Sequence, residues 1–151
     1  MHALKLLLPV LLASRALAAD VEVRNEAEFL RCVPADARVQ RLGTDMKFVE
    51  GPQWVPADGG YLVFSDIPAD EMKKWTPGGG ITSFRTPSQH ANGNTLDRQG
   101  RLLTAEHSGR RVSISEKDGS TRSLVDQFEG KRLNSPNDIV AQRDGTVWFT
   151  D

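Results

Sequence analysis

Cysteine and long hydrophobic runs are both scarce in this sequence. Cys32 is the only cysteine among 151 residues, so an internal disulfide is excluded. We expect Cys32 to be a buried small hydrophobe rather than a reactive thiol. The apolar run from Leu6 to Leu12 is too short for a transmembrane helix, and Pro9 interrupts it. Stability must therefore come from a packed core.

A surplus of basic charge is also missing. The 19 Lys and Arg residues are offset by 20 Asp and Glu residues, which gives a formal net charge of −1. The basic residues are scattered rather than clustered along the chain. This pattern gives no reason to expect a nucleic-acid partner or binding to an anionic membrane.

Residues 1–18 have the pattern of a secretory signal peptide. Lys5 precedes the apolar run, and the small residues Ala16 and Ala18 are typical of a cleavage site. Cleavage after Ala18 removes two basic residues and no acid, which changes the formal charge from −1 to −3. We expect a periplasmic or secreted protein, a monomer or small oligomer, that is free of the membrane after cleavage. The alternative is an uncleaved anchor.

Residues 19–45 are expected to hold one helix and one strand. "NEAEFLRCV" is amphipathic, with Asn25 placed as N-cap, Glu28 at the third helical position and Pro34 as the stop. "ARVQRLG", residues 37–43, alternates polar and apolar residues like a strand. This strand precedes the first repeat and is expected to pair with the last one.

Residues 46–151 contain a repeat. Three stretches align, "QWVPADGGYLVFSD", "NTLDRQGRLLTAE" and "IVAQRDGTVWFTD". Each has a glycine six residues before a terminal acid, at Gly60 and Asp66, Gly100 and Glu106, and Gly145 and Asp151. Turn residues between short β-rich runs predict a hairpin each time. The acids close strands and are expected to hold the loops between repeats.

A second hairpin is predicted inside each interval, in "MKKWTPGGGITSF" and "RVSISEKDGSTRSLV". Two hairpins make four strands at a period of 40 to 45 residues, which is typical of a β-propeller blade. We therefore expect an all-β protein with about two and a half blades in these residues. Propellers close with at least four blades, so we expect this to be the N-terminal portion of a longer protein.

The first residue of each inner strand points toward the propeller axis. That position holds Glu50, Asn92 and Asn137 in the three repeats. Carboxylate and amide oxygens are ligands that Ca²⁺ prefers, and a single acid leaves the ion able to act as a Lewis acid. The alternative is structural, because "NSPND" and "NG" are also turn signals and Glu50 is compatible with a solvated acid.

"FVEGPQWV", "LVFSDI", "NGNTLDRQGRLLTAEHSGRRV" and "FEGKRLNSPNDIVAQRDGTVWFTD" carry a family resemblance. They resemble bacterial gluconolactonases of the senescence-marker-protein/gluconolactonase/luciferin-regenerating-enzyme-like family, over about residues 40–151. The resemblance implies a six-bladed propeller with one catalytic divalent metal, Ca²⁺ or Zn²⁺, that hydrolyses sugar lactones.

The resemblance also implies roles for single residues. The family's Glu ligand falls on Glu50, and the Asn of its "ND" motif, which contacts metal or substrate, falls on Asn137. A further Asn ligand and the Asp that is proposed as general base are expected beyond residue 151. Asn92 is expected to line the substrate pocket. Ser135 stands where some members have a substrate-binding Arg, so substrate contacts are expected to differ.

Two histidines and two rival functions stay open. His90 and His107 lie close to the inner strands, where either an acid–base role or a loop-fixing hydrogen bond is possible. The expected function is hydrolysis of a sugar lactone, with the lactone as the small-molecule partner. The alternatives are hydrolysis of another ester or a phosphotriester on the same scaffold, and a non-catalytic exported binding propeller.

Overall fold

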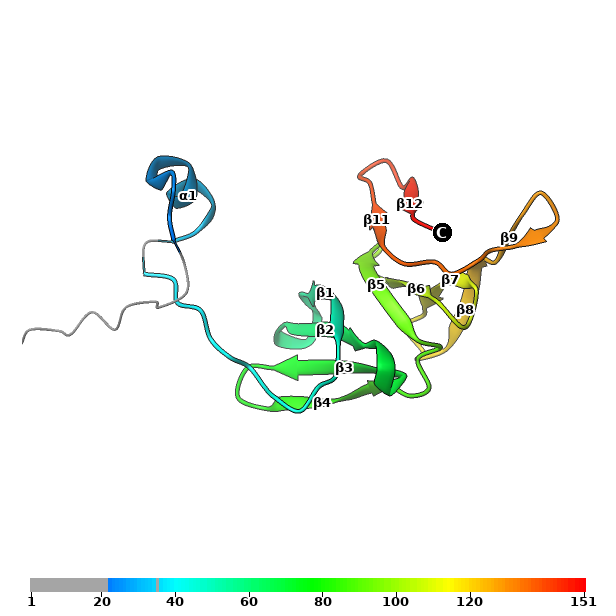
Figure 1. The fold of residues 1–151 in the computed structure, drawn as a ribbon, viewed down its shortest axis with the longest axis horizontal. Helices are drawn as coiled ribbons and strands as arrows, with labels where there is room; N and C mark the ends of the chain where they lie inside the picture. Colours follow the sequence, from blue (N-terminus) through cyan, green and yellow to red (C-terminus); the bar gives the residue numbers. More distant parts are fainter. Residues whose placement is uncertain (1–21, 35) are drawn as a thin grey trace, which may run out of the picture. The chain divides into compact units, whose positions relative to one another are not determined.

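The computed structural model describes residues 22–34 and 36–151 (Figure 1). The predicted signal peptide lies outside the described residues. The chain divides into two compact units, the first ending at Arg41 and the second running from Leu42 to Asp151. Among the described helices, none is long and apolar enough to cross a membrane.

The helix of the first unit begins and ends where the sequence predicts. α1 spans Glu26–Cys32, and the Asn25 side chain accepts a hydrogen bond of 3.3 Å from the Glu28 backbone N–H. Val33 caps the other end, immediately before Pro34. The expectation that Cys32 is buried is wrong, because this one-helix segment buries none of its helical residues and Cys32 is exposed.

Residues 37–43, which were expected to form a strand paired with the last repeat, are not in a strand here, and the expected pairing stays a prediction. Val39, within these residues, is 68% exposed. A strand is defined by backbone hydrogen bonds to a neighbour, and alternation of side chains cannot supply them. No described strand pairs with residues 37–43.

The second unit contains two four-stranded antiparallel sheets with the simplest possible order, each strand beside its sequence neighbour. The first sheet comprises β1 (Val49–Val55), β2 (Tyr61–Asp66), β3 (Glu71–Thr76) and β4 (Gly80–Arg85). The second comprises β5 (Ala91–Leu96), β6 (Leu102–Glu106), β7 (Arg111–Ser115) and β8 (Thr121–Val125). All four predicted hairpins in these two repeats are therefore confirmed.

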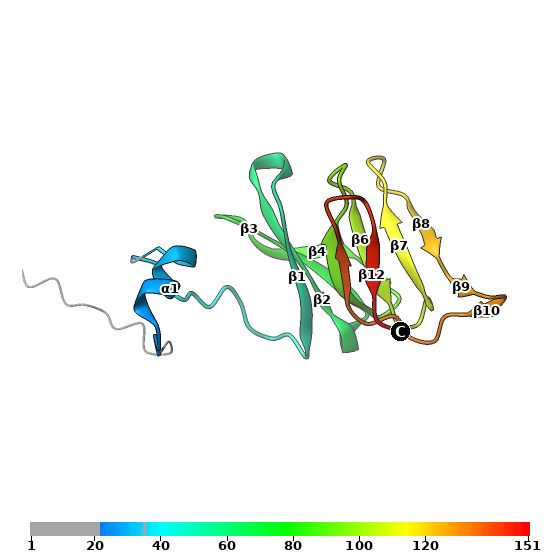
Figure 2. The ribbon, with the colours of Figure 1, turned by 90° about the horizontal axis from the view of Figure 1, so that it is seen from above.

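The third repeat contributes one hairpin, β11 (Ile139–Ala141) and β12 (Val147–Phe149), as predicted. Figures 1 and 2 show the order along the unit, with β5 lying between β1 and β11. The sequence analysis missed the short hairpin of β9 (Gln127–Phe128) and β10 (Lys131–Arg132), and two single-turn 3₁₀ helices at Ala57–Gly59 and Ile67–Ala69. Pairs of two-residue strands give too little periodicity to detect.

The core lies between successive sheets. One cluster joins the first sheet to the second through Val55, Val63, Met72, Ala91 and Leu102. The other joins the second sheet to the third hairpin through Leu103, Ala105, Val112, Ile114 and Ile139. β6 supplies both clusters, since its consecutive Leu102 and Leu103 face opposite sides of the sheet.

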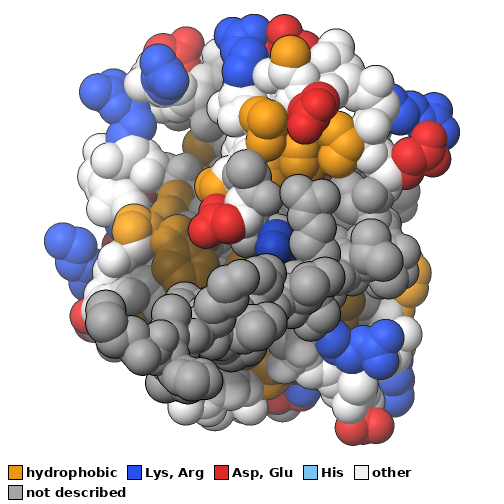
Figure 3. Space-filling view, turned by 90° about the vertical axis from the view of Figure 1, so that its left-hand side faces the viewer, with side chains coloured by type: hydrophobic (Ala, Val, Ile, Leu, Met, Phe, Trp, Pro, Cys, Tyr) orange, Lys and Arg blue, Asp and Glu red, His pale blue; other side chains and the backbone are white. Residues whose placement is uncertain are grey.

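Some large apolar side chains remain at the surface of the second unit. Trp54 is 46% exposed in the first sheet and Trp148 is 60% exposed in the third hairpin. Figure 3, which views the whole molecule from the left-hand side of Figure 1, shows hydrophobic and acidic side chains beside one another at the surface. The repeated sheets thus bury apolar residues between them and leave others uncovered.

Candidate functional site

The two inner strands share a bulge at the position predicted to carry the site. In β1, Glu50 pairs with Ser65 and Gln53 with Val63, which leaves Gly51 and Pro52 outside the ladder. In β5, Ala91 pairs with Glu106 and Asn94 with Thr104, which leaves Asn92 and Gly93 outside. Glycine and proline tolerate such interruptions, and a bulge redirects side chains away from the regular pleat.

Glycine at the bulge lets neighbouring inner strands approach closely. A Cβ atom on Gly51, whose φ is +58°, would lie 2.1 Å from the Asn92 carbonyl oxygen. A Cβ atom on Gly93 would lie 2.9 Å from the Asn137 carbonyl oxygen, and the Gly93 N–H donates a 2.8 Å hydrogen bond to that oxygen. The bulge of each sheet is therefore packed against the start of the next inner strand.

The Asn94 side chain connects the bulges of β1 and β5 by hydrogen bonds. Its amide nitrogen lies 2.9 Å from the Gly51 carbonyl and 3.0 Å from the Asn92 carbonyl, and its Oδ1 accepts a hydrogen bond from the Thr104 hydroxyl. The Ser65 hydroxyl donates a second bond to the Asn92 carbonyl, at 2.8 Å. Asn94 is 7% exposed, so these buried polar groups satisfy one another.

Glu50, Asn92 and Asn137 line the same cavity, which has a volume of about 600 Å³. The structure therefore brings together the three residues that the sequence places at matching points of the repeat. Glu50 and Asn137 are exposed, whereas Asn92 is 7% exposed. The shared cavity is the main structural support for treating the inner-strand positions as one site.

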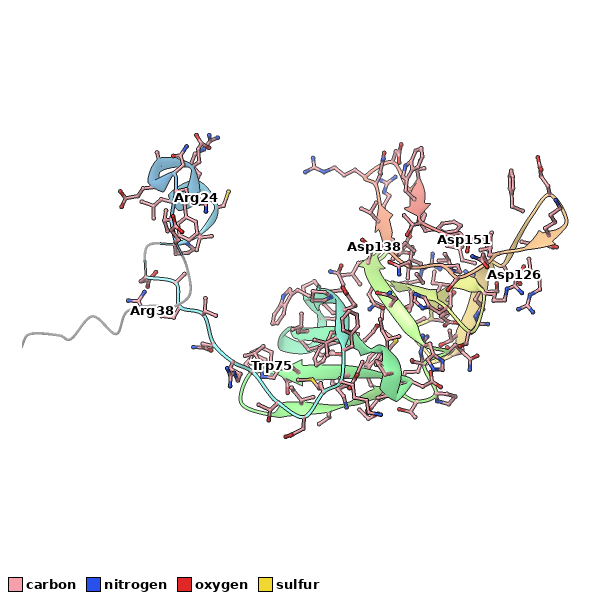
Figure 4. All side chains as sticks on the ribbon, viewed as in Figure 1. Arg24, Arg38, Trp75, Asp126, Asp138 and Asp151 are labelled. Carbon is pink, nitrogen blue, oxygen red and sulfur yellow. The ribbon has the colours of Figure 1, made fainter. Side chains whose placement is uncertain are left out.

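The walls of this cavity differ in character. Phe48, Pro52, Ile67 and Pro68 give the side of the first sheet apolar surface. The other side is polar and consists of Asn92, Asn94, His107, Asn137 and Asp138. Figure 4 shows Asp138 where the chain enters β11, close to the end of β5. A polar wall facing an apolar wall suits a ligand that has one polar and one apolar face.

His107 joins two of the predicted site residues. Its Nε2 lies 3.1 Å from the amide nitrogen of Asn92 and 3.4 Å from that of Asn137. His90 has a different partner, because its Nδ1 lies 2.7 Å from the Ser108 hydroxyl, and it does not line this cavity. Of the two histidines whose roles the sequence leaves open, His107 lines this cavity and His90 does not.

Sequence reasoning missed Asn94, Asp138 and the placement of His107. Asn94 carries no repeat signal, because Pro52 and Ile139 occupy the matching positions. Asp138 was detectable, since it stands where the other repeats have Gly51 and Gly93. His107 directly follows the terminal acid Glu106. Its contact with the third repeat depends on how the repeats pack, which the sequence alone does not specify.

Two of the three terminal acids, Asp66 and Asp151, hold loops as predicted. Asp66 accepts hydrogen bonds from the Lys47 and Phe48 backbone N–H groups, at 3.2 Å each. Asp151, which is labelled in Figure 4, accepts hydrogen bonds from the backbone N–H groups of Asn134 and Ser135. Both carboxylates fix the segment that leads into an inner strand.

Glu106 instead holds arginine side chains. Its carboxylate, which is fully buried, lies 3.0 Å from Arg85 Nη2 and 2.6 Å from Arg111 Nε, and accepts a bond from the Ser113 hydroxyl. Burial lowers the pKa of the Arg85 guanidinium, and Glu106 opposes that shift. The arginine stays charged, so it stays paired with the buried acid.

Asp70 takes over the loop-fixing role before β5. It accepts hydrogen bonds from the Ser88 N–H and hydroxyl and from the His90 N–H, the last at 2.7 Å. Burial alone would raise the pKa of Asp70, but the hydrogen bonds from His90 and Ser88 outweigh it and hold the pKa below its ordinary range. The start of every inner strand is therefore fixed by a carboxylate.

The donor set of the cavity fits a hard cation better than a soft one. In residues 22–34 and 36–151, no three His, Cys, Asp or Glu side chains gather as a metal cluster. The available oxygens include the carboxylates of Glu50 and Asp138 and the amide side chains of Asn92 and Asn137. Within the described part of the chain, no hydrogen bond or ion pair engages the Glu50 carboxylate. Oxygen ligands of this kind suit Ca²⁺.

Comparison with known proteins finds gluconolactonases among the relatives of this chain. The chain is 39% identical over 129 residues to the gluconolactonase of Zymomonas mobilis, an alignment that covers 75% of this chain and 35% of that protein. The gluconolactonase structure from Xanthomonas campestris has 39% identity and a TM-score of 0.69, with 73% of this chain and 37% of that chain covered. The chain thus spans well under half the length of these relatives.

A less similar structure shows the same fold in a protein with a different activity. Virginiamycin B lyase from Staphylococcus aureus is 22% identical with a TM-score of 0.58, over 78% of this chain and 40% of that chain. At this identity the likeness concerns the fold alone. Repeated antiparallel four-stranded sheets with a polar cavity at their inner strands define an all-β, propeller-like fold.

The family follows from the sequence match. Residues 48–151 match the SMP-30/gluconolactonase/LRE-like region. The chain belongs to this family, as the motifs around Glu50 and Asn137 predict.

Proposed function

We propose that the cavity of Glu50, Asn92 and Asn137 is part of a metal-dependent lactonase site that opens a sugar lactone to its hydroxy acid. The observation that carries the proposal is the convergence of these three residues, from three repeats, on one cavity. Gluconolactonase relatives at 39% identity support the reaction class. The finer fold proposed with it is a six-bladed propeller in the complete protein.

One divalent cation is proposed as cofactor, with Ca²⁺ favoured and Zn²⁺ possible. When bound, such an ion polarises a carbonyl and stabilises negative charge on its oxygen. In this chain, Glu50 supplies the charged oxygen and Asn137 a neutral one, and both side chains are exposed to the cavity. The Asn137 amide is alternatively a substrate contact, and the two roles need the same orientation of its oxygen.

The remaining residues of the cavity position the substrate. A sugar lactone carries hydroxyl groups on a ring with apolar C–H edges. The amides of Asn92 and Asn137 are suited to the hydroxyl groups, and Phe48 and Ile67 on the facing wall to the ring edges. No residue of this chain is assigned as the general base. The protein proposed here is thus an exported lactonase that acts on a small soluble substrate.

The Glu50 carboxylate provides the test. We expect Glu50→Gln to raise the Ca²⁺ dissociation constant at least tenfold, because it removes the one charged ligand proposed from this chain. Calcium affinity is measured by calorimetry, and lactone opening by proton release at constant pH, with and without chelator. Glu129→Gln, in the exposed turn between β9 and β10, is the matched control and should change neither value.

Three outcomes of this assay contradict parts of the proposal. Full lactonase activity in Glu50→Gln at limiting Ca²⁺ would remove Glu50 from the site. Turnover of aryl esters or phosphotriesters in place of lactones would replace the substrate class. Tight metal binding with no hydrolysis of any ester in the panel would favour a non-catalytic binding propeller with a structural ion.

A further inference from the structure

We propose that His107 is a positioning residue that turns the side-chain oxygens of Asn92 and Asn137 into the cavity. The effect on cation binding rests on the proposed function, whereas the orientation of the two amides does not. It rests on the two contacts of His107 Nε2, at 3.1 Å to Asn92 Nδ2 and 3.4 Å to Asn137 Nδ2.

The chemistry of the two groups determines which of them donates the hydrogen in these contacts. An amide NH₂ group has hydrogens and no lone pair to offer, so the imidazole nitrogen that it faces must be the acceptor. Nε2 is then unprotonated, and the ring carries its hydrogen on Nδ1. One neutral imidazole nitrogen therefore accepts from two amides that come from different repeats.

These contacts also set the direction of the oxygen atom of each amide. Because the nitrogen of a planar amide points at His107, its oxygen points away from the histidine. Neither Asn92 Oδ1 nor Asn137 Oδ1 has a hydrogen-bond partner within the described part of the chain. Both side chains line the cavity with Glu50 and Asp138, so two neutral oxygens are available beside two carboxylates.

The surroundings hold this histidine in place. The His107 backbone N–H donates to the His90 carbonyl at 3.3 Å, directly after the buried end of β6. Asn92 is 7% exposed and its backbone carbonyl is bound by Ser65 and Asn94. The alternative state of the site has Nε2–H donating to the two amide oxygens, which would turn NH₂ groups toward a cation and weaken its binding.

The direct test is the tautomer of His107. In the protein labelled with ¹⁵N-histidine, a two-bond ¹H–¹⁵N correlation spectrum at neutral pH should show His107 with Nε2 unprotonated and Nδ1 protonated. The signal is assigned by its loss in His107→Gln. A spectrum with hydrogen on Nε2 would overturn the proposal. This measurement needs neither substrate nor metal, so it is independent of whether the protein is a lactonase.

The second test separates positioning from chemistry. His107→Met removes the acceptor at similar size, and His107→Gln keeps an acceptor oxygen near the same place. We expect the Met variant to lose calcium affinity about tenfold or more and the Gln variant to stay within a few-fold of the native protein. His90→Gln is the control, because His90 faces Ser108 outside the cavity.

The kinetic split identifies the competing explanation. If His107 only positions ligands, saturating Ca²⁺ restores the kcat of His107→Met. A kcat that stays low in both His107 variants at saturating Ca²⁺ would overturn the positioning role in favour of proton transfer. Equal affinity loss in the Met and Gln variants would show that the acceptor is irrelevant. The expected tautomer without any calcium binding would keep the amide orientation and remove the metal from the proposed function.

Discussion

The first and second sheets have the same strand order and the same inner-strand bulge, yet they use their terminal acids differently. Asp66 in the first sheet binds backbone N–H groups of the segment before β1. Glu106 in the second sheet binds the side chains of Arg85 and Arg111. The segment before β5 is held instead by Asp70, from the preceding repeat.

The difference shows what a repeat does and does not conserve. Both sheets end the second strand with an acid, but a glutamate is one methylene longer than an aspartate and reaches other partners. The loop-fixing hydrogen bonds are then supplied by a carboxylate elsewhere. Loop fixation is thus required in each repeat, while the residue that provides it varies.

The largest expected effect follows from the buried acid. Glu106→Gln should destabilise the protein by about 3 kcal/mol, because it leaves two guanidinium groups beside a neutral amide. Asp66→Asn keeps an oxygen that accepts one backbone N–H and should destabilise it by only about 1 kcal/mol. Free energies of unfolding from urea titration measure both. Equal losses of unfolding free energy in the two variants would contradict the different roles of Glu106 and Asp66.

A smaller effect is expected at the shared bulge. Gly51→Ala should destabilise the protein by about 2 kcal/mol, because the new methyl group meets the Asn92 carbonyl at a positive φ. Gly100 also has a positive φ, of +75°, but a Cβ atom there meets nothing within 4 Å. Gly100→Ala should therefore lose only about 1 kcal/mol by the same urea titration, from the backbone alone. A Gly51 loss no greater than that of Gly100 would contradict the close approach of β1 and β5.

The smallest effect concerns Asp70 and pH. Its pKa in the folded protein lies below its ordinary value of 3.8, so its hydrogen bonds stabilise the fold fully above that pH. The contribution is lost as pH falls from about 4 through the folded-state pKa, because protonation then favours the unfolded chain. Unfolding free energies measured across this range should fall less steeply in Asp70→Asn than in the native protein. Parallel curves would show that Asp70 does not couple loop fixation to pH.

The sequence predicted the hairpins well because their signals are local. Glycine six residues before each acid has a positive φ at Gly60, Gly100 and Gly145, as a tight turn requires. The strand predicted at residues 37–43 has no partner among the described strands, because alternation shows which faces a strand would have but not where its partner lies. The predicted burial of Cys32 was wrong, because residue type predicts burial only where a core exists to accept the side chain.

The sequence by itself determined the period of the repeat, the turns, and the matching positions of Glu50, Asn92 and Asn137, since each depends on residues close together in the chain. Only the tertiary structure decided which side chains meet: that His107 contacts Asn92 and Asn137, that Asn94 joins two bulges, and that Glu106 pairs with Arg85. These contacts depend on how tightly neighbouring sheets pack. That packing is set by interlocking side chains across the whole core, and no local pattern records it.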